Sequence, residues 1–308
     1  MSTLYRRATG GLARGTIGSV QKLRFGRREV TADRALVMAI INRTRDSFYD
    51  RGSTFDDRAA MAAVDRVVAE GADIVDIGGV RAGSHGEQVD AAEEVRRVVP
   101  FVATVRDRHP DVVISVDTWR HEVARQACAA GADLINDSWA GADPALAEVA
   151  AEHGVGIVCS HTGGARPRTD PHRVRYLDVV AEVTAELVDR AERMVALGVP
   201  AEGILIDPTH DFGKNTWHGL ELLRRLDELV GTGWPVLMAL SNKDFIGETL
   251  GAELADRVDG TLAATSVAAF GGAAVFRAHQ VRQTRRVVEM VASIAGTRPP
   301  ARCLRALA

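Results

Sequence analysis

The sequence predicts an α/β fold, a single (β/α)8 TIM barrel, on three observations. The chain has 308 residues, of which 46% are hydrophobic, and this length suits one barrel domain with a large core. Short runs rich in Val and Ile alternate with longer Ala-rich segments of helical period, which is typical of repeated βα units around a parallel sheet. A polar residue ends or follows each run, as at the carboxyl ends of the strands in barrel enzymes.

Eight segments have the length and composition of buried strands. They cover residues 35–41, 72–78, 112–117, 132–137, 155–160, 203–208, 235–240 and 274–279. Eight segments of helical period follow them, each long enough for a crossover connection between parallel strands. These lie near residues 57–70, 87–108, 119–130, 144–153, 176–197, 217–230, 253–270 and 280–295. The helices before the second and fourth strands end in Gly71 and Gly131, which fit a left-handed helix C-cap.

The barrel is expected to cover residues 35–296, with a short segment at each end. Residues 1–34 are predicted to be an N-terminal extension, in which VQKLRFGRREV (20–30) forms a short hairpin packed under the barrel. Residues 297–308 begin with a pair of prolines within their first four positions and are predicted to be a C-terminal tail.

Charge and cysteine usage exclude several classes of partner. Lys and Arg number 38 against 41 Asp and Glu, and the net charge of −3 gives no general attraction to nucleic acid or to an anionic membrane. No uncharged apolar run reaches the roughly 18 residues of a membrane span. Cys128, Cys159 and Cys303 are widely spaced without a C-x-x-C pair, which favours free thiols in a reducing, cytoplasmic compartment.

The polar residues at the strand ends include an acceptor-rich group and a cationic group. The acceptor-rich group comprises Asp117, Asn136 and Asp207. Its carboxylates and amide suit a ligand rich in N–H donors, such as a heterocycle with an amidine-like edge. The cationic group comprises Lys243, Arg277 and His279, at the strands where barrels commonly bind phosphate. The remaining strand ends carry Asn42, Asp76, Asp137, His161 and Ser241.

Six ordered motifs run through the chain from about residue 34 to 295. They are AIINRTRDSFYDRG (39–52), ISVDTWRHEVA (114–124), GADLINDSW (131–139), LIDPTHDFGKN (205–215), ALSNKDFIG (239–247) and FRAHQV (276–281). In order, they resemble the N-V-T-P-D-S-F, S-I-D-T, I-N-D, D-P-G-x-G-F-G-K, G-x-S-R-K-S-F-I-G and R-V-H-D-V signatures of the dihydropteroate synthases of folate biosynthesis. Because the six motifs occur in the family's order, the resemblance is specific for this pterin-binding barrel.

The resemblance implies a transferase that joins 6-hydroxymethyl-7,8-dihydropterin pyrophosphate to p-aminobenzoate and releases pyrophosphate. By motif matching, the pterin would be held by Asp117, Asn136, Asp207, Phe212, Lys243 and Arg277. Pyrophosphate would be held by Asn42, Arg277 and His279, and Asn42 would also bind Mg²⁺. Ser241 and Arg81 would lie on the aminobenzoate side. The resemblance also implies a homodimer formed through the last helices, in residues 253–295.

The chain departs from the family pattern in its loops. After the second strand the family has D-I-G-G-E-S-T-R-P-G, whereas this chain has DIGGVRAG (76–83), so the Glu-Ser-Thr group is lost and Arg81 stands in for the family's Arg. Arg43 and Arg45 replace Val and Pro in the first loop, which adds positive charge there. Residues 209–211 (THD) replace a glycine-rich stretch where the backbone approaches the ligand closely.

These departures predict a divergent second copy of the synthase that binds a pterin or another anionic ligand but has weak or no synthase activity. Each hydrogen bond lost from a transition state typically lowers the rate by about 10²–10³-fold. Two alternatives stay open: an active synthase that tolerates its altered loops, and a non-catalytic binding barrel or another pterin or pyrophosphate enzyme.

Three further features of the loops have their own interpretations. For His210 and Asp211 the alternatives are a new metal or acid–base pair beside Asp207 and a loop that has drifted in sequence. His161 is expected to be a structural hydrogen-bonding residue, and the basic loop 166–175 to be solvated rather than a docking site for an acidic partner.

Overall fold

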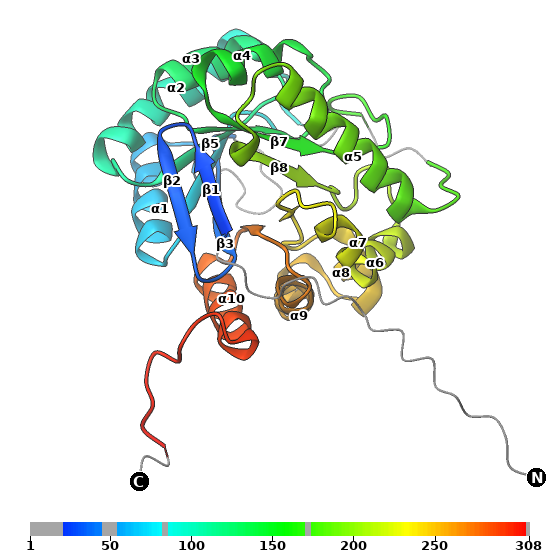
Figure 1. Cartoon of the computed structure of the whole chain (residues 1–308). Coiled ribbons are helices and arrows are strands. Elements are labelled where there is room, and N and C mark those ends of the chain that lie inside the picture. The colour runs from blue at the N-terminus through cyan, green and yellow to red at the C-terminus, as the bar shows by residue number, and fades with distance from the viewer. Residues whose placement is uncertain (1–20, 45–53, 82–85, 170–173, 306–308) are drawn as a thin grey trace, which may run out of the picture.

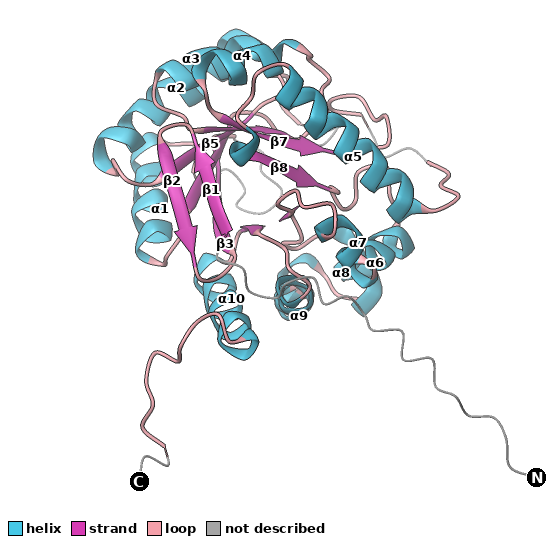
Figure 2. Cartoon of the chain, in the orientation of Figure 1, coloured by secondary structure: helices cyan, strands magenta, loops and turns pink. Residues whose placement is uncertain are grey.

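The computed structural model describes residues 21–44, 54–81, 86–169 and 174–305, and its centre is an eight-stranded parallel barrel (Figures 1 and 2). The strands are β3 (Leu36–Asn42), β4 (Ile74–Gly78), β5 (Val113–Asp117), β6 (Leu134–Asp137), β7 (Gly156–Ser160), β8 (Ile204–Asp207), β9 (Leu237–Met238) and β10 (Val275–Ala278). Their order around the sheet is β8-β7-β6-β5-β4-β3-β10-β9. A bridge between Ile206 and Val236 joins the two ends of the sheet. The structure confirms the predicted fold class.

The register of the sheet brings the polar strand ends to one level. Asn42 is aligned with Gly78, Gly78 with Asp117, and Asp117 with Asn136. Because all strands of the barrel run parallel, these residues share its carboxyl end with the loops that lead into the helices.

Helices surround the barrel, and most begin and end within a few residues of their predicted positions. They are α1 (Asp57–Ala69), α2 (Ala91–Arg108), α3 (His121–Ala129), α4 (Ala145–His153), α5 (Val179–Ala196), α6 (Thr216–Arg224), α7 (Leu226–Val230), α8 (Asp244–Leu250), α9 (Val258–Phe270) and α10 (Val281–Ala295). Short 3-10 turns η1 (Ala201–Gly203) and η2 (Leu254–Asp256) precede β8 and α9. None of the helices in the described ranges combines the length and apolar character that crossing a membrane requires.

Two helical features differ from the prediction. The single helix expected at 217–230 is divided into α6 and α7 at Arg225, whose φ of −111° and ψ of 30° are not helical. The Arg225 guanidinium forms two hydrogen bonds to the carboxylate of Asp178, the N-cap of α5, at 2.9 and 3.0 Å. Helix α8 was not predicted, because the side chain that caps it comes from another loop, as described below.

The hairpin β1 (Gln21–Phe25) and β2 (Arg28–Ala32) covers the amino end of the barrel (Figure 1). Leu23 and Phe25 are buried in one cluster with interior residues of the barrel strands. A Cβ on Gly156 would lie 2.9 Å from the Phe25 ring, so the close approach of hairpin and barrel requires glycine there. Arg28 of the hairpin also forms an ion pair at 3.1 Å with Asp133, which directly precedes β6 of the barrel.

Candidate functional site

Arg277 joins two carboxylates at the carboxyl end of the barrel. Its Nε donates to Asp76 Oδ2 at 2.6 Å, and its Nη2 donates to Asp117 Oδ2 at 2.9 Å. Asp76 also accepts hydrogen bonds from Ser115 Oγ at 2.6 Å and from Asn136 Nδ2 at 3.1 Å. The structure thus brings together three of the predicted residues around Asp76, which sequence reasoning noted only as a strand end. A lone Asp inside an apolar strand was the available signal.

Burial sets the charge state of this group. The pKa of Asp117 is raised to about 6, chiefly because the carboxyl is buried, while the Arg277 cation opposes the rise. Ser138 Oγ donates to the other oxygen of Asp117 at 2.8 Å. The pKa of Arg277 is raised despite its burial, because Asp76 and Asp117 stabilise the cation. The site therefore holds the acceptor oxygens of two carboxylates, whose negative charge is partly balanced by one partly buried guanidinium.

The opposite side of the mouth carries Asp207, Phe212 and Lys243. Asp207 ends β8, and its Oδ1 accepts a hydrogen bond from Thr209 N at 2.7 Å. Burial raises the pKa of Asp207, although Thr209 N and the Lys243 cation both oppose the rise. Lys243 Nζ lies 4.9 Å from the centre of the Phe212 ring, within the range of a cation–π contact. An aromatic face, a cation and a carboxylate therefore adjoin one another here.

Of the two alternatives for His210 and Asp211, the structure does not support a metal or acid–base pair, because the two side chains make different contacts. Asp211 accepts hydrogen bonds from the backbone N–H groups of Asp244 (2.6 Å) and Phe245 (3.3 Å), which caps the start of α8. His210 is buried, contacts Gly219 O through Nε2 at 3.2 Å, and has a pKa lowered to about 3 by burial. His210 is therefore a neutral imidazole that packs between its own loop and helix α6.

Left-handed backbone survives where the family's glycines are replaced. Thr209 has φ of 50° and Asp211 has φ of 70°, a conformation that typically costs about 1 kcal/mol or more outside glycine. Gly213 keeps its glycine, and a Cβ there would lie 2.4 Å from Thr162 O. The loop therefore keeps the backbone conformation of a glycine-rich segment, although two of its positions now have side chains.

A buried lysine that the sequence analysis did not single out holds this loop in place. Lys214 Nζ lies 2.9 Å from both His161 Nδ1 and His161 O, and 3.0 Å from Phe212 O. Burial lowers the pKa of Lys214 to about 7. His161 Nε2 lies 3.2 Å from Glu186 Oε2, so the ring is held on both sides, as expected of a structural residue. The F-G-K segment of the fourth motif was the available signal for Lys214.

Ser241 and His279 are tied together at the ends of β9 and β10. Ser241 Oγ donates to Gln280 Oε1 at 3.0 Å and accepts from His279 N at 3.2 Å. Burial, together with the nearby Arg277 and Lys243 cations, lowers the pKa of His279 to about 3. His279 therefore offers a neutral imidazole here, which corrects the expectation that it adds positive charge.

The first loop does not place Arg43 in the mouth of the barrel. Arg43 is buried, its Nη1 donates to Thr54 O at 3.0 Å, and its Nη2 pairs with Asp57 at the start of α1. Its guanidinium lies 4.5 Å from the centre of the Phe101 ring on α2. Arg43 therefore does not add its positive charge to the mouth of the barrel, and Arg45 lies outside the described residues.

Residues 86–89, near the end of the second loop (79–90), are held by three arginines from three parts of the chain, which we call the arginine clamp (Arg97, Arg120 and Arg168). Arg97 Nη2 contacts Glu87 Oε1 at 2.8 Å, and Arg120 Nη2 donates to Val89 O at 2.8 Å. Arg168, from the basic loop after β7, donates to the carbonyl oxygens of Glu87 at 2.6 Å and of the preceding residue at 3.3 Å. This part of the basic loop is engaged within the molecule rather than solvated.

At its other end, the second loop contains Gly79 and Arg81, and Arg81 is half-buried. Residues 82–85 lie outside the described residues. Gly79 cannot carry a side chain, because a Cβ there would lie 2.7 Å from Val98 and 2.9 Å from Glu94. The described ends of the loop are therefore both packed closely against α2.

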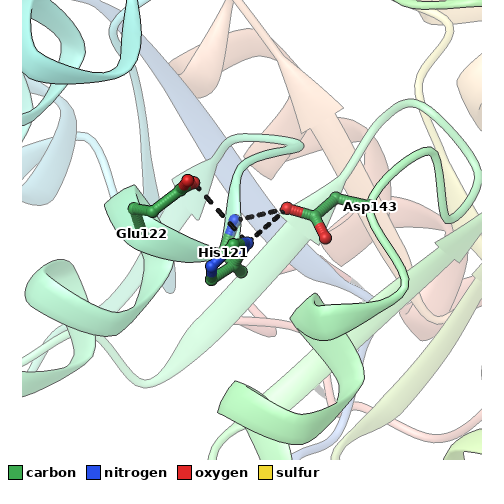
Figure 3. A group of neighbouring side chains, drawn as sticks. All are labelled: His121, Glu122 and Asp143. Atoms are coloured by element: carbon green, nitrogen blue, oxygen red, sulfur yellow. Dashed lines mark hydrogen bonds and ion pairs between the residues drawn. The ribbon is translucent and has the colours of Figure 1, made fainter.

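A cluster of His121, Glu122 and Asp143 lies at the start of α3 (Figure 3). Asp143 Oδ2 accepts from His121 N at 2.9 Å and lies 2.7 Å from His121 Nδ1, and Asp143 Oδ1 accepts from Ala145 N at 3.1 Å. The hydrogen bond to Asp143 raises the pKa of His121. Both oxygens of Asp143 thus anchor the starts of α3 and α4, which accounts for the cluster as a structural contact.

Comparison with known proteins identifies the architecture. Residues 38–279 match the model of the family described as pterin binding enzymes. The chain belongs to this family. The match runs from β3 to His279 and so includes every pterin-binding and pyrophosphate-binding position predicted above.

Within the pterin-binding enzymes, this chain is more similar to relatives named inactive dihydropteroate synthase 2 than to relatives named dihydropteroate synthase. It is 64% identical over 285 residues to the inactive dihydropteroate synthase 2 of Mycobacterium leprae, which covers 91% of this chain and 98% of that relative. It is 36% identical to the dihydropteroate synthase of Streptococcus pyogenes, over 84% of this chain and 96% of the relative. The solved structure of Mycobacterium tuberculosis Rv1207 superposes with a TM-score of 0.70 at 51% identity, over 89% of this chain and 98% of that one. This member of the pterin-binding family is a divergent homologue of dihydropteroate synthase.

Proposed function

We propose that the chain binds a pterin, or a pterin pyrophosphate, in the mouth of the barrel and has weak or no dihydropteroate synthase activity. The observation that carries the proposal is the contrast between the two parts of the site. The acceptor group on the strands is assembled, whereas the second loop has lost its Glu-Ser-Thr group and its residues 86–89 are held by the arginine clamp. The relatives named as inactive second synthases support the same division.

The pterin end of the site would be read by oxygen acceptors from three strands. Asp117, Asn136 and Asp207 present carboxylate or amide oxygens, which match the amino and ring N–H groups of a pterin. Phe212 and Lys243 would line the ring on the far side, where the cation lies 4.9 Å from the aromatic centre. Arg277 would stack near the ring once it is bound.

The pyrophosphate end has a donor set that fits Mg²⁺. Asn42 Oδ1 and Asp117 Oδ2 each lie 3.9 Å from the position that a Cβ on Gly78 would take, so both oxygens border the space that this glycine leaves open. Mg²⁺ binds through one or two protein oxygens together with waters and substrate phosphates. Asn42 would hold the ion, which would neutralise leaving-group charge, and Arg277 and His279 would contact the pyrophosphate directly.

The aminobenzoate end is where turnover would be lost. Ser241 and Arg81 are the residues expected on that side, and the Ser241 hydroxyl is already engaged with Gln280 and His279. The second loop cannot supply the missing hydrogen bonds, because the Glu-Ser-Thr group is not in the sequence. Losing two or three transition-state hydrogen bonds, at about 10²–10³-fold each, leaves little useful rate.

Calorimetry and a pyrophosphate-release assay test the two halves of the proposal separately. We expect 6-hydroxymethyl-7,8-dihydropterin pyrophosphate to bind in the presence of Mg²⁺, and Asp207→Asn to weaken that binding. Asp65→Asn is the matched control, since Asp65 pairs with Arg108 on the helical surface. Adding p-aminobenzoate should give turnover at least about 10³-fold below that of an active synthase. Turnover equal to that of an active synthase would refute the loss of activity, and no affinity for the pterin would refute binding.

We further propose that the chain is a cytoplasmic homodimer paired through α9 and α10. These helices expose Val267, Phe270, Met290 and Ile294, at 48 to 63% of their full surface. Apolar side chains gathered on neighbouring helices are typical of interfaces between subunits. The free thiols of Cys128, Cys159 and Cys303 suit a reducing compartment. A molar mass of twice 33.0 kDa by light scattering is expected, and a monomer at micromolar concentration would contradict the pairing.

A further inference from the structure

Three aromatic rings from three different loops meet at the mouth of the barrel. The Trp139 ring centre lies 5.1 Å from that of Phe212, with the planes at 75°, and 6.4 Å from that of Trp119, with the planes at 81°. Both contacts are edge-to-face, an arrangement that aromatic pairs favour. Trp139 is only 3% exposed, although it lies in a loop. Its indole therefore fills the space between the loops that follow β5, β6 and β8.

A tight turn fixes the direction of the Trp139 side chain. Asp137 Oδ1 accepts from Trp139 N at 3.2 Å, and its Oδ2 accepts from Gly141 N at 2.6 Å. Ala140 and Gly141 both have positive φ, at 57° and 74°. The turn is thus closed by two hydrogen bonds to one buried carboxylate, so the indole is positioned before any ligand arrives.

Trp139 adjoins the candidate pterin site through two neighbouring residues, Ser138 and Phe212. The residue before it, Ser138, donates from Oγ to Asp117 Oδ1 at 2.8 Å. Trp139 packs against the Phe212 ring, and Lys243 Nζ lies 4.9 Å from the centre of that ring. Trp139 therefore connects the acceptor side of the mouth with its aromatic and cationic side.

We propose that Trp139 is a specificity-determining residue, whose indole forms a fixed wall of the pterin pocket and limits the ligand to a bicyclic ring. The inference rests on the proposed function, and it adds which pterins the pocket accepts. A wall held by two edge-to-face contacts and a closed turn cannot move aside without breaking those contacts, so a third fused ring would be excluded. The ligand class is a planar bicycle with the amino–oxo edge of a pterin.

Two ligands and three variants test this wall. The ligands are 6-hydroxymethylpterin and its tricyclic, benzo-fused analogue with the same 2-amino-4-oxo edge, titrated by calorimetry. We expect the wild type to prefer the bicycle by about 10- to 200-fold, the range that steric selection in an apolar pocket provides. Trp139→Ala should reduce this preference at least tenfold by admitting the tricycle, while Trp139→Phe should keep an intermediate preference. Trp217→Phe is the matched control, because this indole is 77% exposed on α6.

A second readout does not depend on the stability of the alanine variant. The chain has four tryptophans, and a bound pterin should quench their emission. We expect Trp139→Phe to lose more of this quenching than Trp217→Phe does.

The outcomes separate the two proposals. Binding of 6-hydroxymethylpterin without a preference over the tricycle, or with equal quenching in both Phe variants, would refute the wall and leave pterin binding intact. No binding of 6-hydroxymethylpterin by the wild type would refute the proposed function, and the wall with it.

Discussion

Replacing Arg277 with Met removes the one cation that joins Asp76 and Asp117. Both carboxylates stay in place, and Asp76 is fully buried. Removing one partner of a buried ion pair typically destabilises a protein by about 3–5 kcal/mol, because an unpaired charge is left inside. Asp76 would keep its bonds from Ser115 and Asn136, which places our expectation at the lower end, about 3 kcal/mol. The measurement is urea unfolding at pH 7, followed by circular dichroism.

The double variant Arg277→Met with Asp117→Asn is the control for this loss. The amide removes one of the two carboxylates, so the double variant should regain about 1–2 kcal/mol relative to Arg277→Met. In this double-mutant cycle the losses of stability in Arg277→Met and Asp117→Asn should not be additive, because Arg277 and Asp117 are in direct contact at 2.9 Å.

The loss should also depend on pH in one direction. Burial raises the pKa of Asp117 to about 6 in the folded state, against an ordinary value of 3.8. The stability that proton uptake by Asp117 contributes is thus fully present below about pH 4 and is lost as the pH rises through 6. Without Arg277 the Asp117 carboxyl is protonated more readily, so the difference in the free energy of unfolding between Arg277→Met and the wild type should become smaller from pH 7 to pH 5. A loss below about 1 kcal/mol at pH 7, or a gap that widens on acidification, would refute the account.

Three further predictions concern the loops. Arg168→Ala should speed amide hydrogen exchange in residues 86–89 while changing the melting temperature little, and unchanged exchange would show that the arginine clamp does not hold the second loop. The pKa of Lys214 is lowered from 10.5 to about 7, so its contribution to the free energy of unfolding is lost below pH 7 and rises as the pH increases from 7 to 10.5. Lys214→Met should therefore reduce the increase in the urea midpoint between pH 7 and pH 9. An equal increase in the variant and the wild type would contradict this. Asp211→Ala should destabilise the protein by about 1 kcal/mol or more, because it removes the cap of α8. Asp211→Gly also removes the cap but should lose less stability, because glycine adopts the φ of 70° at this position without strain. Equal melting temperatures for the two variants would contradict the backbone strain.

Much of the barrel could be predicted because its signals are local. Each strand is a buried apolar run, and the polar residue at its end must face the same mouth in a parallel barrel. This rule located Asp117, Asn136 and Arg277, which the structure brings into one hydrogen-bonded group.

The remaining features depend on contacts between distant residues, which no local pattern contains. Helix α8 is capped by Asp211, more than thirty positions upstream of the helix. Arg168 reaches Glu87, 81 positions away, and the two loops show no complementary pattern in sequence. The position of Arg43 could not be predicted for the same reason, because its guanidinium is held by Thr54, by Asp57 on α1 and by the Phe101 ring on α2.

Binding without turnover is physically consistent because the two depend on different parts of the barrel. The acceptor residues lie on strands, whose register is fixed by ladders on both sides, so drift in the loops leaves them in place. Catalysis needs additional donors that act only in the transition state, and these would come from the loops. Inserting Glu-Ser-Thr before Arg81 tests this division, since it should raise turnover and leave pterin affinity nearly unchanged. If the insertion raises turnover only when combined with Arg168→Ala, then the arginine clamp, and not the missing side chains alone, keeps the loop from acting.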